Sequence, residues 1–174
     1  ALSLASMGYG VTVVDSRESI GDKLCTGLVG EECFRHYPID PRLVHRELNS
    51  ASVIAPSGEV VRFETPYPVA RVVDRVAYVA SFADRAREAG AEYLLGHRVL
   101  SLEQQKDRVS VSTEDGTKEA RALVLAVGFG SQLNRQLGLG EPSDYVVGVQ
   151  ALVKTEGVDE VEVYLGRDIA PGFF

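Results

Sequence analysis

Apolar positions in the first third of the chain indicate a helix, a strand and then mostly irregular structure. Residues 1–7 have helical spacing, and Gly8 and Gly10 stop the helix. A β-branched run at residues 11–14 follows and is closed by Asp15. A continuous apolar run of this kind is typical of a strand buried on both faces in a parallel sheet. The pattern further predicts a loop at 16–30, a helix at 31–37, and a turn or two of helix within 41–48.

The middle of the chain combines a hairpin with a long helix. Two strand-like runs flank Pro56-Ser57-Gly58, which is a turn sequence. Asp74 is placed to cap an amphipathic helix that Gly90 ends. We therefore predict hairpin strands at 51–55 and 59–64, a short strand at 70–73, a helix at 75–88 and a strand at 91–95.

After residue 97 the hydrophobic period changes to two, which favours strands. Three alternating runs with Asp115-Gly116 at a turn predict a β-meander. A buried apolar strand is expected at 123–126, and it leads into Gly128-Phe129-Gly130-Ser131. The complete prediction for this part is a meander at 98–103, 108–113 and 117–120, a helix at 132–137, and strands at 146–154 and 161–165 that are long enough to pair.

The order of these elements predicts an α/β protein with a parallel sheet. The hairpin at 51–64 and the strands after residue 144 fit that sheet poorly. We expect them to form a second, antiparallel sheet that is assembled from two separate stretches of the chain.

Composition restricts the class of protein. The 174 residues are 45% apolar, which is ordinary for a globular domain, and no apolar run is long enough to span a membrane. A net charge of −7 disfavours nucleic acid as a partner. Cys25 and Cys33 have the spacing of neither a zinc site nor a disulfide framework, so we expect a reducing, cytoplasmic setting and no metal. Both ends are apolar and look truncated.

Asp15 is the first candidate for binding chemistry. A helix, a glycine turn and a strand that ends in an acidic residue form the second half of a dinucleotide-binding βαβ unit, in which the acid binds a ribose. The glycine-rich phosphate loop would lie about 20 residues earlier, ahead of Ala1. The alternative is that Asp15 only solvates or caps the end of a strand.

Several stretches together resemble the FAD-dependent oxidoreductases of the hydroxylase-like superfamily, above all the geranylgeranyl reductase family. The first is ALSLASMGYGVTVVDSR, which is similar to that family's first helix and second strand. KLCTGLV resembles its loop near the flavin, and VVDRVAYVASFADRAREAGAEYLLGHRV resembles its arginine-bearing strand-to-helix segment. GRDIAPGFF resembles the stretch that leads into an aromatic substrate-site motif.

The resemblance implies a Rossmann-like FAD-binding domain, with parallel sheet and β-meander, plus part of an antiparallel-sheet substrate domain. It assigns 1–49 and 70–139 to the FAD-binding domain, and 50–69 and 140–174 to the substrate domain. Asp15 would bind the adenosine ribose, Arg75 would reach the phosphates or ribityl chain, and the backbone of Val99 would meet the adenine. The full set of implied cofactor-binding residues is Asp15, Arg17, Cys25, Thr26, Gly27, Arg75, Val99 and Gly128.

One position departs from the superfamily pattern. An Asp-Gly pair with a serine three residues after the glycine is usual, and here Gly128, Ser131 and Arg135 fit while Val127 replaces the aspartate. The missing carboxylate counts against an aromatic hydroxylase more than against a reductase.

The resemblance implies an enzyme that uses reduced flavin to reduce double bonds of an isoprenoid lipid, with NAD(P)H or a ferredoxin-type protein as electron donor. A lipid substrate would allow peripheral contact with a membrane. The sequence assigns no catalytic residue and no oligomeric state, and we expect the 174 residues alone to be inactive. Two alternatives stay open: a flavin-dependent monooxygenase or halogenase of the same superfamily, and a truncated fragment that does not bind flavin.

Overall fold

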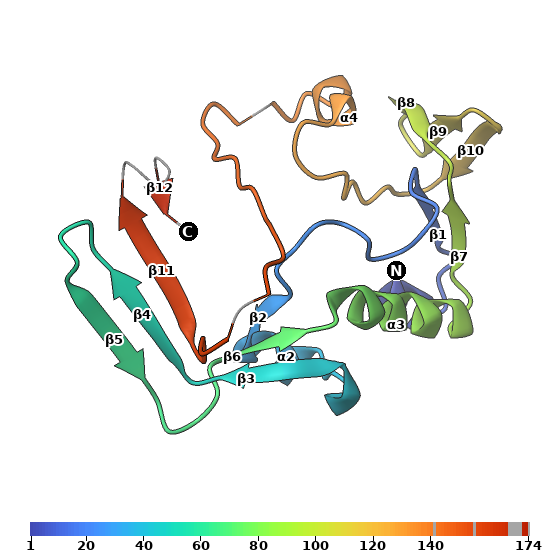
Figure 1. Ribbon diagram of the computed structural model, residues 1–174. Coiled ribbons are helices and arrows are strands. Elements are labelled where there is room, and N and C mark those ends of the chain that lie inside the picture. The colour runs from blue at the N-terminus through green and yellow to red at the C-terminus, as the bar shows by residue number, and fades with distance from the viewer. Residues whose placement is uncertain (141, 155, 167–171, 174) are drawn as a thin grey trace. The chain divides into compact units, whose positions relative to one another are not determined.

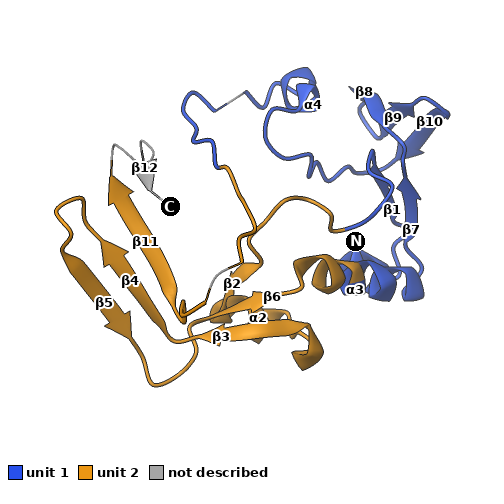
Figure 2. Cartoon of the chain, in the orientation of Figure 1, with its two compact units in different colours: residues 1–20, 81–148 blue, residues 21–80, 149–174 orange. Residues whose placement is uncertain are grey.

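The computed structural model describes residues 1–140, 142–154, 156–166 and 172–173. The chain divides into two compact units (Figure 2). Unit 1 comprises residues 1–20 and 81–148, and unit 2 comprises residues 21–80 and 149–174. Which parts bind cofactor and which bind substrate stays a prediction, and each unit is described by itself.

Unit 1 contains the predicted parallel strand pair. Strand β1 (Thr12–Asp15) runs parallel to β7 (Glu92–Leu95), with Thr12 opposite Glu92. Helix α1 (Leu2–Ser6) and the second half of α3 (Arg75–Glu88) pack close to this pair through small residues. Ala5, Ala86 and Ala91 form the buried cluster, and Ala86 is completely buried. The helix–strand alternation predicted from the sequence is confirmed here.

The meander predicted after residue 97 is also confirmed. Strands β8 (Val99–Gln104), β9 (Val109–Thr113) and β10 (Gly116–Ala120) form an antiparallel sheet in the order β10-β9-β8. Helix α4 (Gln132–Gln136) follows, and the Ser131 hydroxyl accepts a hydrogen bond from the Leu133 N–H at its start.

Two predicted strands of the second half are wrong. Residues 123–126 and 146–154 have no regular secondary structure, and Val124 and Val149 are 77% and 88% exposed. Within the described part of the chain, no strand pairs with either segment. An apolar run becomes a buried strand only where a neighbouring strand accepts its backbone hydrogen bonds.

Unit 2 contains a small antiparallel sheet in the order β2-β6-β3. Its strands are β2 (Leu28–Gly30), β6 (Ala70–Val73) and β3 (Val44–Leu48). The predicted loop at 16–30 therefore ends in a strand. Of the helical turns predicted within 41–48, only the 3₁₀ helix η1 (Pro41–Leu43) is present. The remaining residues form β3, because they pair with β6.

Helix α2 (Glu31–His36) packs beside this sheet. The rings of Phe34 and Tyr78 lie 5.8 Å apart between centroids, and both residues are buried. Arg71 stacks over Phe34 and pairs with Glu31 at 3.0 Å. Burial raises the pKa of Tyr78 to about 12, with the nearby Cys33 as a second cause. The Tyr78 hydroxyl donates to the backbone oxygen of Tyr37.

The second sheet of unit 2 joins two distant stretches of the chain, as the sequence predicted (Figure 1). The order is β12-β11-β4-β5, with β4 (Ser50–Ile54), β5 (Val60–Glu64), β11 (Val161–Gly166) and β12 (Gly172–Phe173). The hairpin β4–β5 and the pair β11–β12 are antiparallel. The sheet is not antiparallel throughout, as predicted, but mixed, because β11 runs alongside β4 in the same direction.

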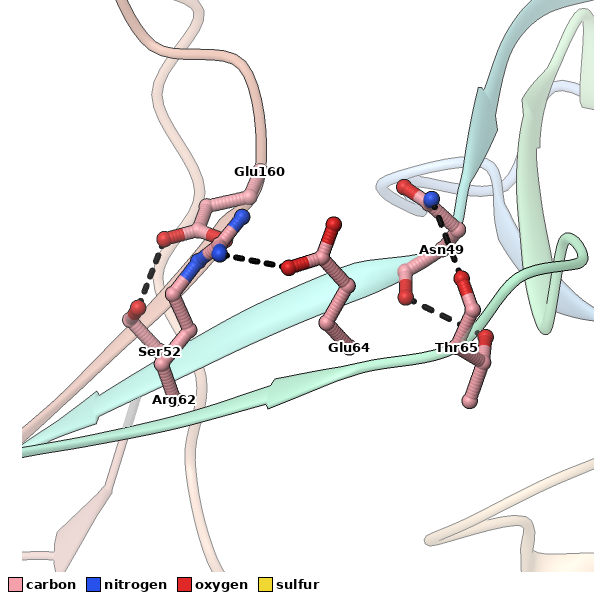
Figure 3. Close-up of polar contacts among 6 residues, drawn as sticks. All are labelled: Asn49, Ser52, Arg62, Glu64, Thr65 and Glu160. Atoms are coloured by element: carbon pink, nitrogen blue, oxygen red, sulfur yellow. Dashed lines mark hydrogen bonds and ion pairs between the residues drawn. The ribbon is translucent and has the colours of Figure 1, made fainter.

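A polar network fastens these two stretches (Figure 3). Glu160 lies just before β11 and accepts hydrogen bonds from the Ser52 hydroxyl at 2.6 Å and from Arg62 Nε at 2.8 Å. Arg62 also donates to Glu64 at 2.7 Å. These partners lower the pKa of Glu160 to about 2, and the Ser52 hydrogen bond is the largest cause. At the open end of the hairpin, directly after Glu64, Asn49 and Thr65 exchange hydrogen bonds.

Candidate functional site

Asp15 stands at the carboxyl end of β1, where the parallel pair ends. Its Oδ1 accepts a hydrogen bond from the Arg17 N–H at 2.9 Å, which turns the chain after the strand. The segment that follows β7 lies alongside residues 15–17. The Gly96 N–H donates to the Arg17 oxygen, and the His97 N–H donates to the Asp15 oxygen. The carboxyl ends of parallel strands are where α/β proteins bind ligands.

Val99 begins the meander directly after this turn. It is the first residue of β8 and lies opposite Thr113 of β9. His97, two residues earlier, contacts the Asp115 carboxylate in the turn between β9 and β10. The sequence could not point to this contact, because it depends on how the meander folds back over 18 residues. The structure thus places Asp15, Arg17 and Val99 along one stretch of connected backbone.

Gly128 lies in the irregular segment that follows the meander. Its φ is +74°, and a Cβ at this position would meet open space. The Asn134 side chain of α4 donates to its backbone oxygen at 3.4 Å. Gly128 therefore leaves its backbone accessible, as a close approach by a ligand requires.

Unit 2 contains the other four candidates, which all belong to the loop 21–27 or to the start of α3. Gly27 is buried with φ +75°, and a Cβ there would lie 2.6 Å from the Val73 backbone oxygen. The Val73 N–H donates to the Gly27 oxygen at 3.0 Å. The Thr26 hydroxyl accepts from the Leu28 N–H at 3.3 Å. The loop thus lies against β6 in a conformation that glycine alone adopts easily.

Cys25 presents an exposed free thiol next to these residues. Its backbone oxygen accepts a hydrogen bond from the Gln150 side chain at 3.3 Å. Gln150 lies 125 residues from Cys25 in the chain, so this contact could not be predicted from the sequence. It lies within the residues predicted to form a strand.

Arg75 is the first residue of α3, and its guanidinium turns toward the loop 21–27. It donates to the Gly21 backbone oxygen at 2.6 Å and to the Lys23 backbone oxygen. The helix itself is capped by Asp74, whose Oδ1 accepts from the Ala77 N–H at 3.0 Å, as predicted. In this structure the acceptors of Arg75 are therefore carbonyl oxygens of the chain itself.

Two further observations concern the described residues as a whole. Among them, no three His, Cys, Asp or Glu side chains are grouped so that they could hold a metal ion. None of the described helices has both the length and the apolar character to cross a membrane.

Comparison with known proteins gives the class. The family described as "FAD dependent oxidoreductase" matches residues 28–169. This match covers most of the chain, and the chain therefore belongs to the FAD-dependent oxidoreductase family.

Several curated proteins are similar to this chain in sequence. A digeranylgeranylglycerophospholipid reductase 1 from Methanococcoides burtonii is 26% identical over 99% of this chain and 46% of its own length. A geranylgeranyl diphosphate reductase from Rhodobacter capsulatus is 28% identical over 79% of this chain and 36% of its own length. The probable electron transfer flavoprotein-quinone oxidoreductase YdiS from Escherichia coli is 25% identical over 88% of this chain. The chain spans less than half the length of these relatives.

Solved structures support the fold. A geranylgeranyl bacteriochlorophyll reductase-like protein from Thermoplasma acidophilum superimposes with a TM-score of 0.72 over 95% of this chain, at 18% identity. The p-nitrophenol 4-monooxygenase PnpA from Pseudomonas putida gives a TM-score of 0.66 over 79% of this chain, at 16% identity. The predicted α/β, Rossmann-like FAD-binding fold is confirmed.

Proposed function

We propose that this chain belongs to a flavoenzyme that binds FAD and reduces double bonds of an isoprenoid lipid. The family match over residues 28–169 carries the flavin part of the proposal. The relatives named as reductases of geranylgeranyl compounds support the substrate class.

The residues described above suit FAD as a ligand. Asp15 offers carboxylate oxygens at the carboxyl end of a parallel strand, where ribose hydroxyls can donate to them. Gly128 leaves open space for close approach to its backbone. In unit 1 the proposed cofactor contacts are Asp15, Arg17, Val99 and Gly128. For Cys25, Thr26, Gly27 and Arg75 of unit 2 the same role is proposed from the resemblance alone. Bound FAD would supply hydride chemistry, and this chain would supply its position and its electrostatic surroundings.

The second sheet of unit 2 supports a lipid substrate. Side chains alternate between the two faces of a strand, and the strand register places six apolar residues on one face. Val61 and Phe63 on this face are 56% and 60% exposed. The residues of this apolar face are Ala51, Val53, Val61, Phe63, Val161 and Val163. An exposed apolar sheet face of this kind suits a hydrocarbon chain.

The opposite face of the same sheet is largely polar. It carries Ser52, Arg62 and Glu64, which belong to the network around Glu160. The sheet thus has one apolar and one largely polar face, and a lipid would contact the apolar face.

The test is flavin-dependent reduction of a defined lipid by the full-length protein. The visible absorbance of the purified protein reports bound flavin. The chemically reduced flavin is then mixed, without oxygen, with a geranylgeranyl lipid. We expect flavin reoxidation together with a lipid that has gained two hydrogen atoms per reduced double bond. NADPH, NADH and a reduced ferredoxin are compared afterwards as donors.

Other products would point to other functions. A colourless protein would refute both flavin-based functions. Incorporation of oxygen or halogen into an aromatic compound would favour a monooxygenase or halogenase. Reoxidation by a quinone with the lipid left unchanged would also contradict the lipid-reductase proposal.

A further inference from the structure

The loop 21–27 is held to the rest of unit 2 through alternate backbone oxygens. Arg75 donates to the oxygens of Gly21 and Lys23. Gln150 donates to the oxygen of Cys25, and the Val73 N–H donates to the oxygen of Gly27. Every second carbonyl of the loop thus has a donor from outside the loop, and two of the four bonds come from one guanidinium.

Close packing fixes both ends of the same loop. At Gly21, where φ is +90°, a Cβ would lie 2.8 Å from the Val76 backbone oxygen in the first turn of α3. At Gly27, a Cβ would meet the Val73 backbone oxygen. Between these ends the side chains of Lys23, Leu24 and Cys25 are exposed, so they add little packing of their own. The middle of the loop therefore depends on the donors from Arg75 and Gln150.

We propose that Arg75 and Gln150 are positioning residues that clamp the loop 21–27 by its carbonyl oxygens and so set how Cys25, Thr26 and Gly27 are presented. The significance of this clamp for catalysis rests on the proposed function, in which these three residues lie beside the flavin. The clamp itself is a property of the chain and can be tested without flavin.

Lys23 provides a direct probe. A lysine-specific protease attacks the carbonyl group of lysine, and the Lys23 carbonyl is the group that Arg75 engages. Cleavage after Lys23 therefore requires local release of the loop, and its rate reports the released population. The chain has three other lysines, and Lys106, in the turn between β8 and β9, is an internal reference for protease activity.

We expect Arg75→Met to raise the rate of cleavage after Lys23, relative to Lys106, by at least about tenfold, because charge-assisted hydrogen bonds are lost. Gln150→Met removes one neutral hydrogen bond and should raise the rate by roughly threefold. Arg75→Lys retains a cationic donor and should give an intermediate rate, and the extra cleavage site it introduces is distinguished by fragment mass. The matched control is Arg85→Met on the same helix, where the guanidinium stacks on Phe82, and it should leave Lys23 cleavage unchanged.

Lys23 cleavage at the wild-type rate in both Arg75→Met and Gln150→Met would overturn the clamp. If circular dichroism shows that Arg75→Met does not fold, Arg75→Lys and Gln150→Met carry the same comparison, and wild-type rates in both overturn it equally. FAD binding is measured in parallel on the full-length protein. Loss of FAD affinity in Arg75→Met with unchanged Lys23 cleavage assigns Arg75 to the cofactor and refutes the clamp. A wild-type protein that binds no FAD refutes the proposed function and leaves the cleavage result intact.

Discussion

At the scale of single residues, the backbone geometry of Gly27 and the carboxylate of Asp15 can each be tested by substitution. Gly27 combines positive φ with a tight approach to β6, whereas Gly58, in the hairpin turn, combines positive φ (+87°) with open space. Comparing the two separates the effect of backbone strain from the effect of a steric clash.

We predict that Gly27→Ala lowers the free energy of unfolding by about 2–4 kcal/mol, because an added Cβ is both strained and in collision with the Val73 oxygen. Gly58→Ala should lower it by about 1 kcal/mol, since only the strain applies. Urea denaturation followed by circular dichroism measures both. Equal effects of the two substitutions would show that the approach to β6 is not tight.

Asp15→Asn tests the proposed ribose contact. The asparagine oxygen can still accept from the Arg17 N–H, so the turn is retained while the negative charge is lost. We predict an FAD affinity about tenfold lower in the full-length protein, measured by flavin fluorescence titration. Asp107→Asn, in the turn between β8 and β9, makes the same charge change and should bind FAD as the wild type does. A wild-type affinity in Asp15→Asn would remove Asp15 from the site.

At the scale of elements, local pattern predicted most helices and strands, together with the pairing within the hairpin and within the meander. The helix at 75–88, its Asp74 cap and the meander depend on neighbouring residues, and all three are confirmed. Strands β2 and β3 were not predicted. They form by pairing with β6, and the local sequence does not encode this pairing. The predictions of strands at 123–126 and 146–154 were wrong because apolar character alone does not provide a pairing partner.

Strand β5 allows a sharp test of the proposed lipid-binding face. Val60 and Val61 are neighbours with similar exposure, 58% and 56%, and they lie on opposite faces of the sheet. We predict that Val61→Glu weakens binding of a geranylgeranyl lipid by about tenfold, because a charge then faces the hydrocarbon chain. Val60→Glu should bind as the wild type does. Lipid binding by the full-length protein is measured by titration, and equal losses in both variants would contradict a sided site.

At the scale of the whole molecule, the sequence indicated which residues are candidates for the site but not which distant residues they contact. Asp15 was predicted because it closes a strand, and the structure places it at the end of a parallel pair. The donors that hold the loop 21–27 could not be predicted in the same way. Gln150 lies 125 residues from its acceptor, and the guanidinium of Arg75 lies more than 50 residues from its own.

Acid should weaken the junction between the two stretches of unit 2. The pKa of Glu160 falls from 4.5 to about 2 on folding, so its contribution to stability is complete above pH 4.5 and is lost as the pH falls toward 2. We predict that Glu160→Gln makes the unfolding free energy less dependent on pH between 4.5 and 2. Urea denaturation across this range measures the effect, with Glu103→Gln, an exposed carboxylate of β8, as the control. The same acid dependence in Glu160→Gln as in the wild type would disprove this role.

The parallel pairing of β4 with β11 also has a consequence for biosynthesis. Ser52 and Glu160, which bond across this junction, are 108 residues apart in the chain. At typical rates of translation, β4 emerges from the ribosome roughly 5–20 s before its partner exists. During that interval the β4 edge of the hairpin, which β11 later covers, is unpaired, and an unpaired strand edge favours self-association. The nascent chain is therefore most in need of chaperone protection after the hairpin has formed and before β11 arrives.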